Sequence, residues 1–313
     1  MKKKLVLIML GITLLLTACN KGSQANSQSQ QTESQEETEN VSEGKDLSQY
    51  ENKVKLMCYN IFYKDVADRS ADIQDLILKN DPDVLMLQEV SVDWIPYLQD
   101  FMSTNNYSYY GYGRYGGELS ATDLQSGDQF TPILWKTEKY ELKESGHFWL
   151  SSTPDVYSAA WVDGTVSKFP RCVNWVILQD KETGGEFMAL CIHTDPESEV
   201  VRTNSSQLAV EMVKEISKGR PVVMAGDWNM SITDAAYLAV TEGGYPDVRF
   251  EAEETTYSGS FNAWGERADD NYAFGDHIFM SDNMGAKFFE VVNDYYDGVH
   301  ISDHNPLLTE LYY

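Results

Sequence analysis

The chain has 313 residues, of which 42% are hydrophobic and 12% aromatic, enough to build a sizeable buried core. Its formal charge at pH 7 is −25. A field of that sign repels polyanions at long range, which argues against stable nonspecific binding to long nucleic acids. A pocket lined by cations could still bind a single phosphate group.

The first 19 residues have the features of an export signal. Lys2, Lys3 and Lys4 precede the apolar run at 5–16, and the segment ends in Leu16-Thr17-Ala18-Cys19. The run is too short for an ordinary membrane span. The segment resembles a bacterial lipoprotein signal peptide, which implies cleavage before Cys19 and lipid modification of its thiol. We therefore expect a protein anchored by lipid to the extracellular face of the bacterial cell membrane.

Residues 20–49 are dominated by Ser, Gln and Glu and contain almost nothing apolar to bury. Such a composition predicts a disordered tether. Residues 50–313 are then the folded domain, which we expect to be a monomer. Its three cysteines, Cys58, Cys172 and Cys191, have no zinc-type spacing and permit at most one disulfide. Cys58 and Cys191 lie in apolar strand-like runs, where buried free thiols are the expected state.

The domain begins with alternating strand and helix patterns. Residues 54–60 predict a strand, 65–80 a helix with an apolar face, and 83–89 a second, nearly all-apolar strand that ends in Gln88-Glu89. A carboxylate at that position is a metal ligand, an ion-pair partner or a residue already in water. Glu89 alone does not decide between these alternatives.

The same pattern recurs along the chain. The apolar run 54–60 ends in Asn60, the run 187–192 is followed by His193, and the run 221–225 leads through Gly226 to Asp227 and Asn229. In a layered sheet protein, polar residues at strand ends gather on one edge, where loops can form a pocket. We expect these side chains to converge.

Six short motifs appear in a fixed order over nearly the whole domain. They are Met57-Cys58-Tyr59-Asn60, Leu87-Gln88-Glu89-Val90, Ile192-His193-Thr194-Asp195, Gly226-Asp227-Trp228-Asn229-Met230, Asp276-His277-Ile278-Phe279 and Ser302-Asp303-His304. Each is weak alone, since Gly-Asp-x-Asn or Asp-His is most often an ordinary turn. The ordered set resembles the endonuclease/exonuclease/phosphatase family. The resemblance implies a four-layer α/β/β/α sandwich of two mixed β-sheets flanked by helices.

The resemblance implies phosphate-ester hydrolysis, and the residue types fit that reaction when a hard cation assists it. Asn60, Glu89 and Asp303 offer an amide oxygen and two carboxylates, which suit Mg²⁺, with Mn²⁺ as an alternative. The resemblance makes Glu89 the main ligand. It also makes His304 the base that takes a proton from the attacking water, with Asp276 orienting its imidazole.

The remaining predicted site residues serve other sides of the phosphate. Asp227 would orient the water or bind a second metal, and Asn229 would donate a hydrogen bond to the developing negative charge. His193 would stabilise or protonate the leaving oxygen, and Arg171 matches a family arginine that contacts phosphate. The family's nucleases support that histidine with a carboxylate. Here the matching stretch, Gly127-Asp128-Gln129-Phe130, offers Asp or Gln, and the sequence leaves the register open.

A tyrosine-rich segment at 107–117 predicts a loop with flat stacking surfaces, in which Arg114 is a further candidate phosphate contact. A surface turn is the alternative interpretation. We expect a divalent-metal-dependent phosphoesterase with an unidentified phosphate-ester substrate. An extracellular nuclease, a sphingomyelinase-like phospholipid phosphodiesterase and a non-catalytic surface binding protein of the same fold are the alternatives.

Overall fold

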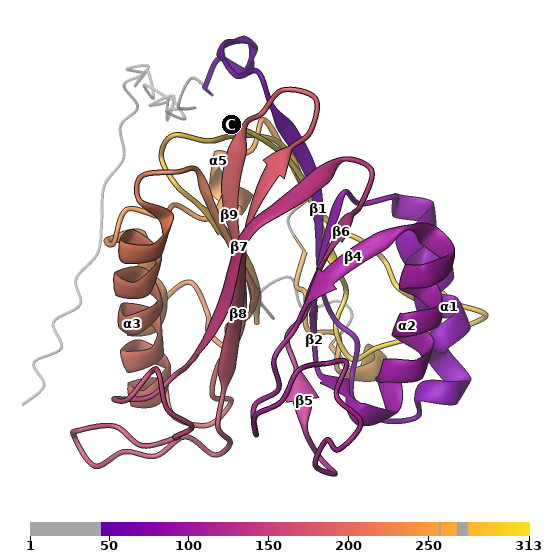
Figure 1. Ribbon diagram of the computed structural model, residues 1–313, viewed down its shortest axis with the longest axis vertical. Coiled ribbons are helices and arrows are strands. Elements are labelled where there is room, and N and C mark those ends of the chain that lie inside the picture. Colours follow the sequence, from indigo (N-terminus) through magenta and orange to yellow (C-terminus); the bar gives the residue numbers. More distant parts are fainter. Residues whose placement is uncertain (1–44, 257, 268–274) are drawn as a thin grey trace, which may run out of the picture. The chain divides into compact units, whose positions relative to one another are not determined.

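Two β-sheets lie face to face with helices on their outer sides (Figure 1). The structure is a computed structural model that describes residues 45–256, 258–267 and 275–313. The expected signal peptide with Cys19, and the tether up to residue 44, lie outside the described residues. Among those described, no helix is long and apolar enough to cross a membrane.

The larger sheet has seven strands. In spatial order they are β11 (Glu254–Thr255), β13 (Gly285–Val291), β16 (Leu307–Tyr312), β1 (Lys53–Asn60), β2 (Val84–Gln88), β6 (Ile133–Lys136) and β4 (Tyr107–Tyr110). The smaller sheet has five strands, in the order β12 (Asp276–Met280), β10 (Val222–Asp227), β9 (Glu186–His193), β8 (Cys172–Asp180) and β7 (Tyr140–Trp149). Two short pairs stand apart: β3 (Val90–Ser91) with β5 (Gln129–Phe130), and β14 (Tyr295–Tyr296) with β15 (Val299–His300).

The helices complete four layers (Figure 1). The seven-stranded sheet carries α1 (Val66–Asn80) and α2 (Ile95–Asn105), and the five-stranded sheet carries α3 (Glu199–Ser217) with α4 (Ala235–Thr241) beside it. The short elements are α5 (Val248–Glu251), η1 (Leu47–Gln49), η2 (Val92–Trp94) and η3 (Ala263–Gly265). The predicted sandwich of two mixed sheets flanked by helices is confirmed.

Alternating side chains explain the layering. On β1, Leu56 and Cys58 point into the core between the two sheets, whereas Met57 and Tyr59 point into the core beneath α1 and α2. A third core lies under α3 and includes Met224 of β10. Burying one such side chain stabilises the fold by about 1.5–3 kcal/mol. Each sheet has a hydrophobic core on both of its faces and is stabilised from both sides.

Strand direction brings the predicted site residues to one edge. Asn60 is the last residue of β1, which runs parallel to β2, and His193 is the last residue of β9, which runs parallel to β10. Asp276 begins β12, which is antiparallel to β10 and places it opposite Asp227. Asp303 and His304 precede β16, which is antiparallel to β1 and pairs Leu307 with Cys58. The convergence expected from the sequence is therefore found.

The structure also bears on the expected state of the cysteines and on the end of the expected tether. Cys58, Cys172 and Cys191 are free and buried, which was expected for Cys58 and Cys191. Five residues assigned to the tether are described, and they contact the domain: Leu47–Gln49 form η1, and Lys45 Nζ donates hydrogen bonds of 2.8 Å to the carbonyls of Asp282 and Met284.

Candidate active site

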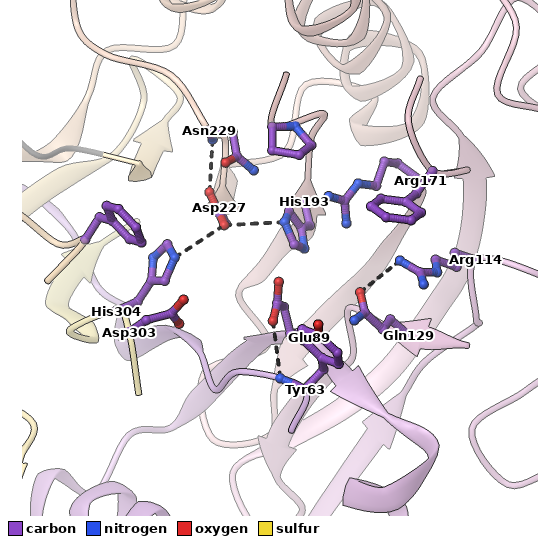
Figure 2. A pocket seen from close by; sticks show the side chains of 13 residues that line it. Tyr63, Glu89, Arg114, Gln129, Arg171, His193, Asp227, Asn229, Asp303 and His304 are labelled. Atoms are coloured by element: carbon purple, nitrogen blue, oxygen red, sulfur yellow. Dashed lines mark hydrogen bonds and ion pairs between the residues drawn. The ribbon is translucent and has the colours of Figure 1, made fainter. Parts of the chain in front are cut away.

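A cavity of about 400 Å³ opens at the edge where these strands end (Figure 2). It is lined by residues from both sheets and from the loops between them: Tyr63, Glu89, Arg114, Gln129, Phe169, Arg171, His193, Pro196, Asp227, Asn229, Phe261, Asp303 and His304. Seven of the predicted site residues are in this group. Asn60 and Asp276 lie directly behind it, in contact with lining residues.

Glu89 reaches the cavity because the strand breaks at that residue. We expected the strand to include it, but β2 ends at Gln88, and Glu89 has a φ of +59° before β3 begins. A non-glycine residue in this region is uncommon, and such backbone strain is concentrated at functional sites. The backbone N–H of Tyr63 donates to Glu89 Oε2 at 3.2 Å and fixes the carboxylate.

Asp303 is held by the segment that precedes it. Ser302 Oγ donates to the carbonyl of Asn60 at 2.7 Å, and Ser302 N–H donates to Asp294 Oδ2 at 2.9 Å. His300 contacts the other oxygen of Asp294. The Asp303 Oδ1 atom is buried and has no hydrogen-bond partner among the described residues, so it is available to a cation.

His304 is oriented by Asp276 from behind the cavity. The His304 Nδ1 and Asp276 Oδ2 atoms lie 2.7 Å apart, and the ring packs against Phe261 with centroids 5.0 Å apart. The other ring nitrogen, Nε2, is 3.8 Å from Asp227 Oδ2. A carboxylate that holds one ring nitrogen fixes the tautomer and leaves the other nitrogen to act on a proton.

Asp227 lies between the two predicted catalytic histidines (Figure 2). Its Oδ2 atom is 3.4 Å from His193 Nε2 and accepts a hydrogen bond from Asn60 Nδ2 at 3.0 Å. Its Oδ1 atom accepts the backbone N–H of Asn229 at 3.0 Å. The Asn229 residue has a φ of +49°, which turns the chain sharply after β10 and keeps Asn229 at the cavity.

The electrostatics of the three groups are strongly perturbed. Burial raises the pKa of Asp227 to about 7. Burial alone would lower the pKa of His304, but the carboxylates of Asp276 and Asp227 raise it to about 10. Burial, together with the positive charge of Arg171, lowers the pKa of His193 well below its ordinary value. Such shifts are typical of functional sites.

Arg171 lies at the other end of the cavity from His304, with His193 between them (Figure 2). The structure shows which of the two candidates in the stretch at 127–130, Asp128 or Gln129, faces the cavity. Gln129 lines the cavity, whereas Asp128 is fully buried and accepts hydrogen bonds from the backbone N–H groups of Tyr115 and Gln129. Among the described residues neither Asp128 nor Gln129 hydrogen-bonds His193, and the carboxylate next to that histidine is Asp227, 3.4 Å from its Nε2 atom.

Comparison with known proteins decides the family. The family model described as Endonuclease/Exonuclease/phosphatase family matches residues 57–304. The chain belongs to this family. Its matched span contains the six motifs and every residue of the cavity.

Solved structures of the family include close structural matches. The mannosyl-6-phosphatase of Bacteroides thetaiotaomicron is 27% identical, with a TM-score of 0.74 over 83% of this chain and 100% of that chain. A family member from Bacteroides vulgatus is also 27% identical, with a TM-score of 0.73 over 83% and 98%. D. rerio TDP2, complexed with a single-strand DNA product, is 18% identical and shares the fold, with a TM-score of 0.64 over 84% and 100%. No curated protein sequence matches the chain.

The residues present suit the divalent cation on which the family generally depends. Burial and the neighbouring Asp303 carboxylate raise the pKa of Glu89, and burial also raises the pKa of Asp303. Two carboxylates that share a cavity and disfavour each other's charge are stabilised by a hard cation. Asn60 fits less directly, because it does not line the cavity and its Oδ1 atom already accepts the N–H of Phe62 at 3.1 Å.

A second group of possible ligands is better described as a proton relay. Atoms of Asp227, Asp276 and His304 lie within 4.8 Å of one another. The His304 Nδ1 and Asp276 Oδ2 atoms are 2.7 Å apart, which is a hydrogen-bond distance, so each of these two atoms already has the other as its partner. Glu89 and Asp303 are therefore the residues that could hold a cation at the cavity.

Sequence reasoning did not identify Phe169, Tyr63, Pro196 or Phe261 as lining residues, and it left Gln129 open as an alternative to Asp128. They lie in loops or short strands without a polar strand-end signature. His277 is buried and pairs with Asp247 through Nδ1 at 2.9 Å. Its Nε2 atom contacts the carbonyl of Met230 at 3.0 Å.

Proposed function

We propose that the chain is a divalent-cation-dependent phosphoesterase that hydrolyses a phosphate ester by attack of water on phosphorus. One observation carries the proposal: the Asp276–His304 pair faces the same cavity as the unpartnered carboxylate oxygen of Asp303 and the strained Glu89. The proposed proton acceptor and the proposed cation ligands thus lie in one cavity, whose volume of about 400 Å³ is large enough for a phosphate ester.

In the proposed reaction His304 takes the proton of the attacking water through Nε2, while Asp276 holds Nδ1. Glu89 and Asp303, with Asn60 behind them, would hold Mg²⁺ or Mn²⁺. When bound, the cation supplies positive charge that neutralises the phosphoryl oxygens and the carboxylates around His304. His304 then works as a neutral base despite the high pKa that its carboxylate neighbours give it.

The other residues act on the opposite faces of the phosphate. Asp227 lies between the two histidines and orients the water. Asn229 hydrogen-bonds the developing negative charge. His193 donates a hydrogen bond to the leaving oxygen, a task that suits a neutral imidazole.

Family membership supports hydrolase activity, and the likeness to a mannosyl-6-phosphatase supports a phosphate monoester as substrate. The acidic composition counts against a nonspecific nuclease. A non-catalytic surface binding protein has no need of the Asp276–His304 relay.

The test uses the protein from residue 45 onward, with Mg²⁺ or Mn²⁺. Phosphate release and diester cleavage are measured on sugar phosphates, DNA, RNA, sphingomyelin, phosphoinositides and bis(p-nitrophenyl) phosphate, beside His304→Ala. We expect turnover of at least one substrate that requires metal and is lost in His304→Ala. Absence of metal-dependent turnover, or full activity of that variant, would contradict the proposal.

We also propose that the protein is a monomer anchored by lipid on Cys19 to the extracellular face of the cell membrane. The leader sequence supports the anchor. In cells expressing the full chain, Cys19→Ser should move the protein from the membrane fraction to the soluble fraction. Unchanged fractionation would contradict the anchor, and a dimer mass in light scattering would contradict the monomer.

A further inference from the structure

Arg171 is a buried cation without a partner. Its side chain lines the cavity, yet the residue is only 7% exposed. Its guanidinium makes no hydrogen bond or ion pair with any of the described residues, and its Nε atom is buried and unsatisfied. Removing a charge from water costs several kcal/mol unless an opposite charge compensates it, so this position is prepared for an anion.

Arg114 lies beside it with neutral partners only. Its Nη1 donates to Gln129 Oε1 at 2.9 Å and its Nη2 donates to the carbonyl of Gly127 at 2.7 Å. A carboxylate in place of Gln129 would cancel the charge of Arg114. Asp128 does not substitute for it, because its carboxylate accepts backbone N–H groups instead.

Phe169 fixes both guanidinium groups. The Arg114 Cζ atom lies 4.8 Å from the ring centroid of Phe169, and the Arg171 Cζ atom lies 5.7 Å from it. Contacts of this kind hold a guanidinium over an aromatic ring without neutralising it. A chain with a formal charge of −25 thus concentrates, on one wall of a cavity, two positive charges that form no ion pair with any described residue.

The location of this wall indicates which part of a substrate it contacts. In Figure 2, His304 and Asp303 occupy one end of the cavity, His193 follows, and the arginines occupy the other end. If water is activated at His304 and the leaving oxygen faces His193, the arginines lie on the leaving-group side. They are then positioned for a group beyond the scissile bond.

We infer that Arg114 and Arg171, with Phe169 and Gln129, form a second anion subsite. The substrate therefore carries another anionic group, a phosphate or a carboxylate, on its leaving group. This inference rests on the proposed function, which supplies the direction of attack. It refines the sequence-based role of Arg171 from a contact with the hydrolysed phosphate to a contact with the second anion.

Binding of inorganic sulfate to the metal-free protein tests the subsite without turnover. Without a cation, the carboxylates of Glu89, Asp227 and Asp303 repel anions, so sulfate should bind only at the arginines. Calorimetry should detect binding that weakens tenfold or more in Arg114→Gln and in Arg171→Gln. Lys168→Gln is the matched control, because Lys168 Nζ lies 5.6 Å from the same ring but is exposed and paired with Glu197.

This control should bind sulfate as the unaltered protein does, and circular dichroism should show that all three variants are folded. If sulfate does not bind, or binds to both arginine variants as tightly as to the unaltered protein, the subsite is overturned. This holds whether or not the protein is an enzyme. Sulfate binding without any turnover would support the subsite and contradict only the proposed function.

Matched substrates identify the second anion. One series has the same three-carbon skeleton and an increasing number of anionic groups: glycerol 3-phosphate, 3-phosphoglycerate with a carboxylate, and 2,3-bisphosphoglycerate with a carboxylate and a second phosphate. A second series, on a longer skeleton, compares fructose 6-phosphate with fructose 1,6-bisphosphate. With Mg²⁺ we expect kcat/KM at least tenfold higher for a doubly anionic member, and loss of that advantage in Arg171→Gln through KM. Equal kcat/KM within both series would overturn the inference.

Discussion

Asp276 Oδ2 lies 2.7 Å from His304 Nδ1, and the residue next to Asp276 on the same strand forms a second pair of similar geometry. His277 Nδ1 lies 2.9 Å from Asp247 Oδ2 on the other face of β12. Both pairs are buried, but only His304 lines the cavity. The protein therefore contains a matched control for its own proposed relay.

Asp276→Asn should lower kcat by a factor of about 10²–10⁴ with little change in KM, because an amide no longer holds the imidazole in the required tautomer. Steady-state kinetics on the best substrate measures this. Asp247→Asn removes the equivalent carboxylate from His277 and should lower stability while leaving kcat within about threefold. A larger loss of kcat in Asp247→Asn than in Asp276→Asn would contradict the assignment.

Glu89→Gln should weaken binding of Mg²⁺ or Mn²⁺ by a factor of about ten or more, since it removes one of two carboxylates from the proposed cation site. Calorimetric titration of each metal measures the affinity without turnover. Glu118→Gln is an exposed control that should leave the affinity unchanged. Equal affinities in Glu89→Gln and the unaltered protein would place the cation elsewhere.

The Asp83 carboxylate should make stability depend on pH. Burial alone would raise its pKa, but the ammonium group of Lys139 and the backbone N–H of Lys55 hold the pKa below its ordinary value. A depressed pKa stabilises the fold above the unfolded value of about 3.9, and this stabilisation disappears as pH falls through the folded value.

Asp83→Asn should therefore lower the free energy of unfolding by about 1–3 kcal/mol at pH 7, and the difference should shrink toward pH 3. Urea unfolding across this pH range measures it. Asp81→Asn is the control, because Asp81 has a side chain that is 73% exposed and should contribute less than about 1 kcal/mol. A difference for Asp83→Asn that is independent of pH would contradict the explanation.

Gly226 permits the close approach of β9 and β10 just before Asp227. A Cβ atom there would lie 1.9 Å from the carbonyl oxygen of Ile192, so Gly226→Ala must push the strands apart. We expect the free energy of unfolding, measured with urea, to fall by at least about 2 kcal/mol in Gly226→Ala. Gly275→Ala should be nearly neutral, because the nearest atom of the described residues to its Cβ would be Asp227 Oδ1 at 3.6 Å. Equal stability of both variants would contradict the account.

Sequence reasoning could predict those parts of the site that follow from strand pattern. Asn60, His193 and Asp227 end strands, and parallel pairing brings such ends together. The layers were predictable only through family resemblance, because alternating strands and helices are compatible with several folds.

The remaining features depend on backbone conformation and loops. Strand periodicity does not reveal that Glu89 leaves β2 at positive φ. Choosing between Asp128 and Gln129 required the pairing of Gln129–Phe130 with Val90–Ser91, a two-residue contact that propensity cannot specify. Phe169 carries no charge, and only its position between two arginines gives it a role.

The central claim is that water attacks phosphorus at the cavity beside His304. Hydrolysis of a turned-over substrate in water enriched in ¹⁸O, followed by mass spectrometry of both products, tests it directly. The account predicts one ¹⁸O atom in the phosphate-containing product and none in the released alcohol. Label in the alcohol, or in neither product, would contradict it.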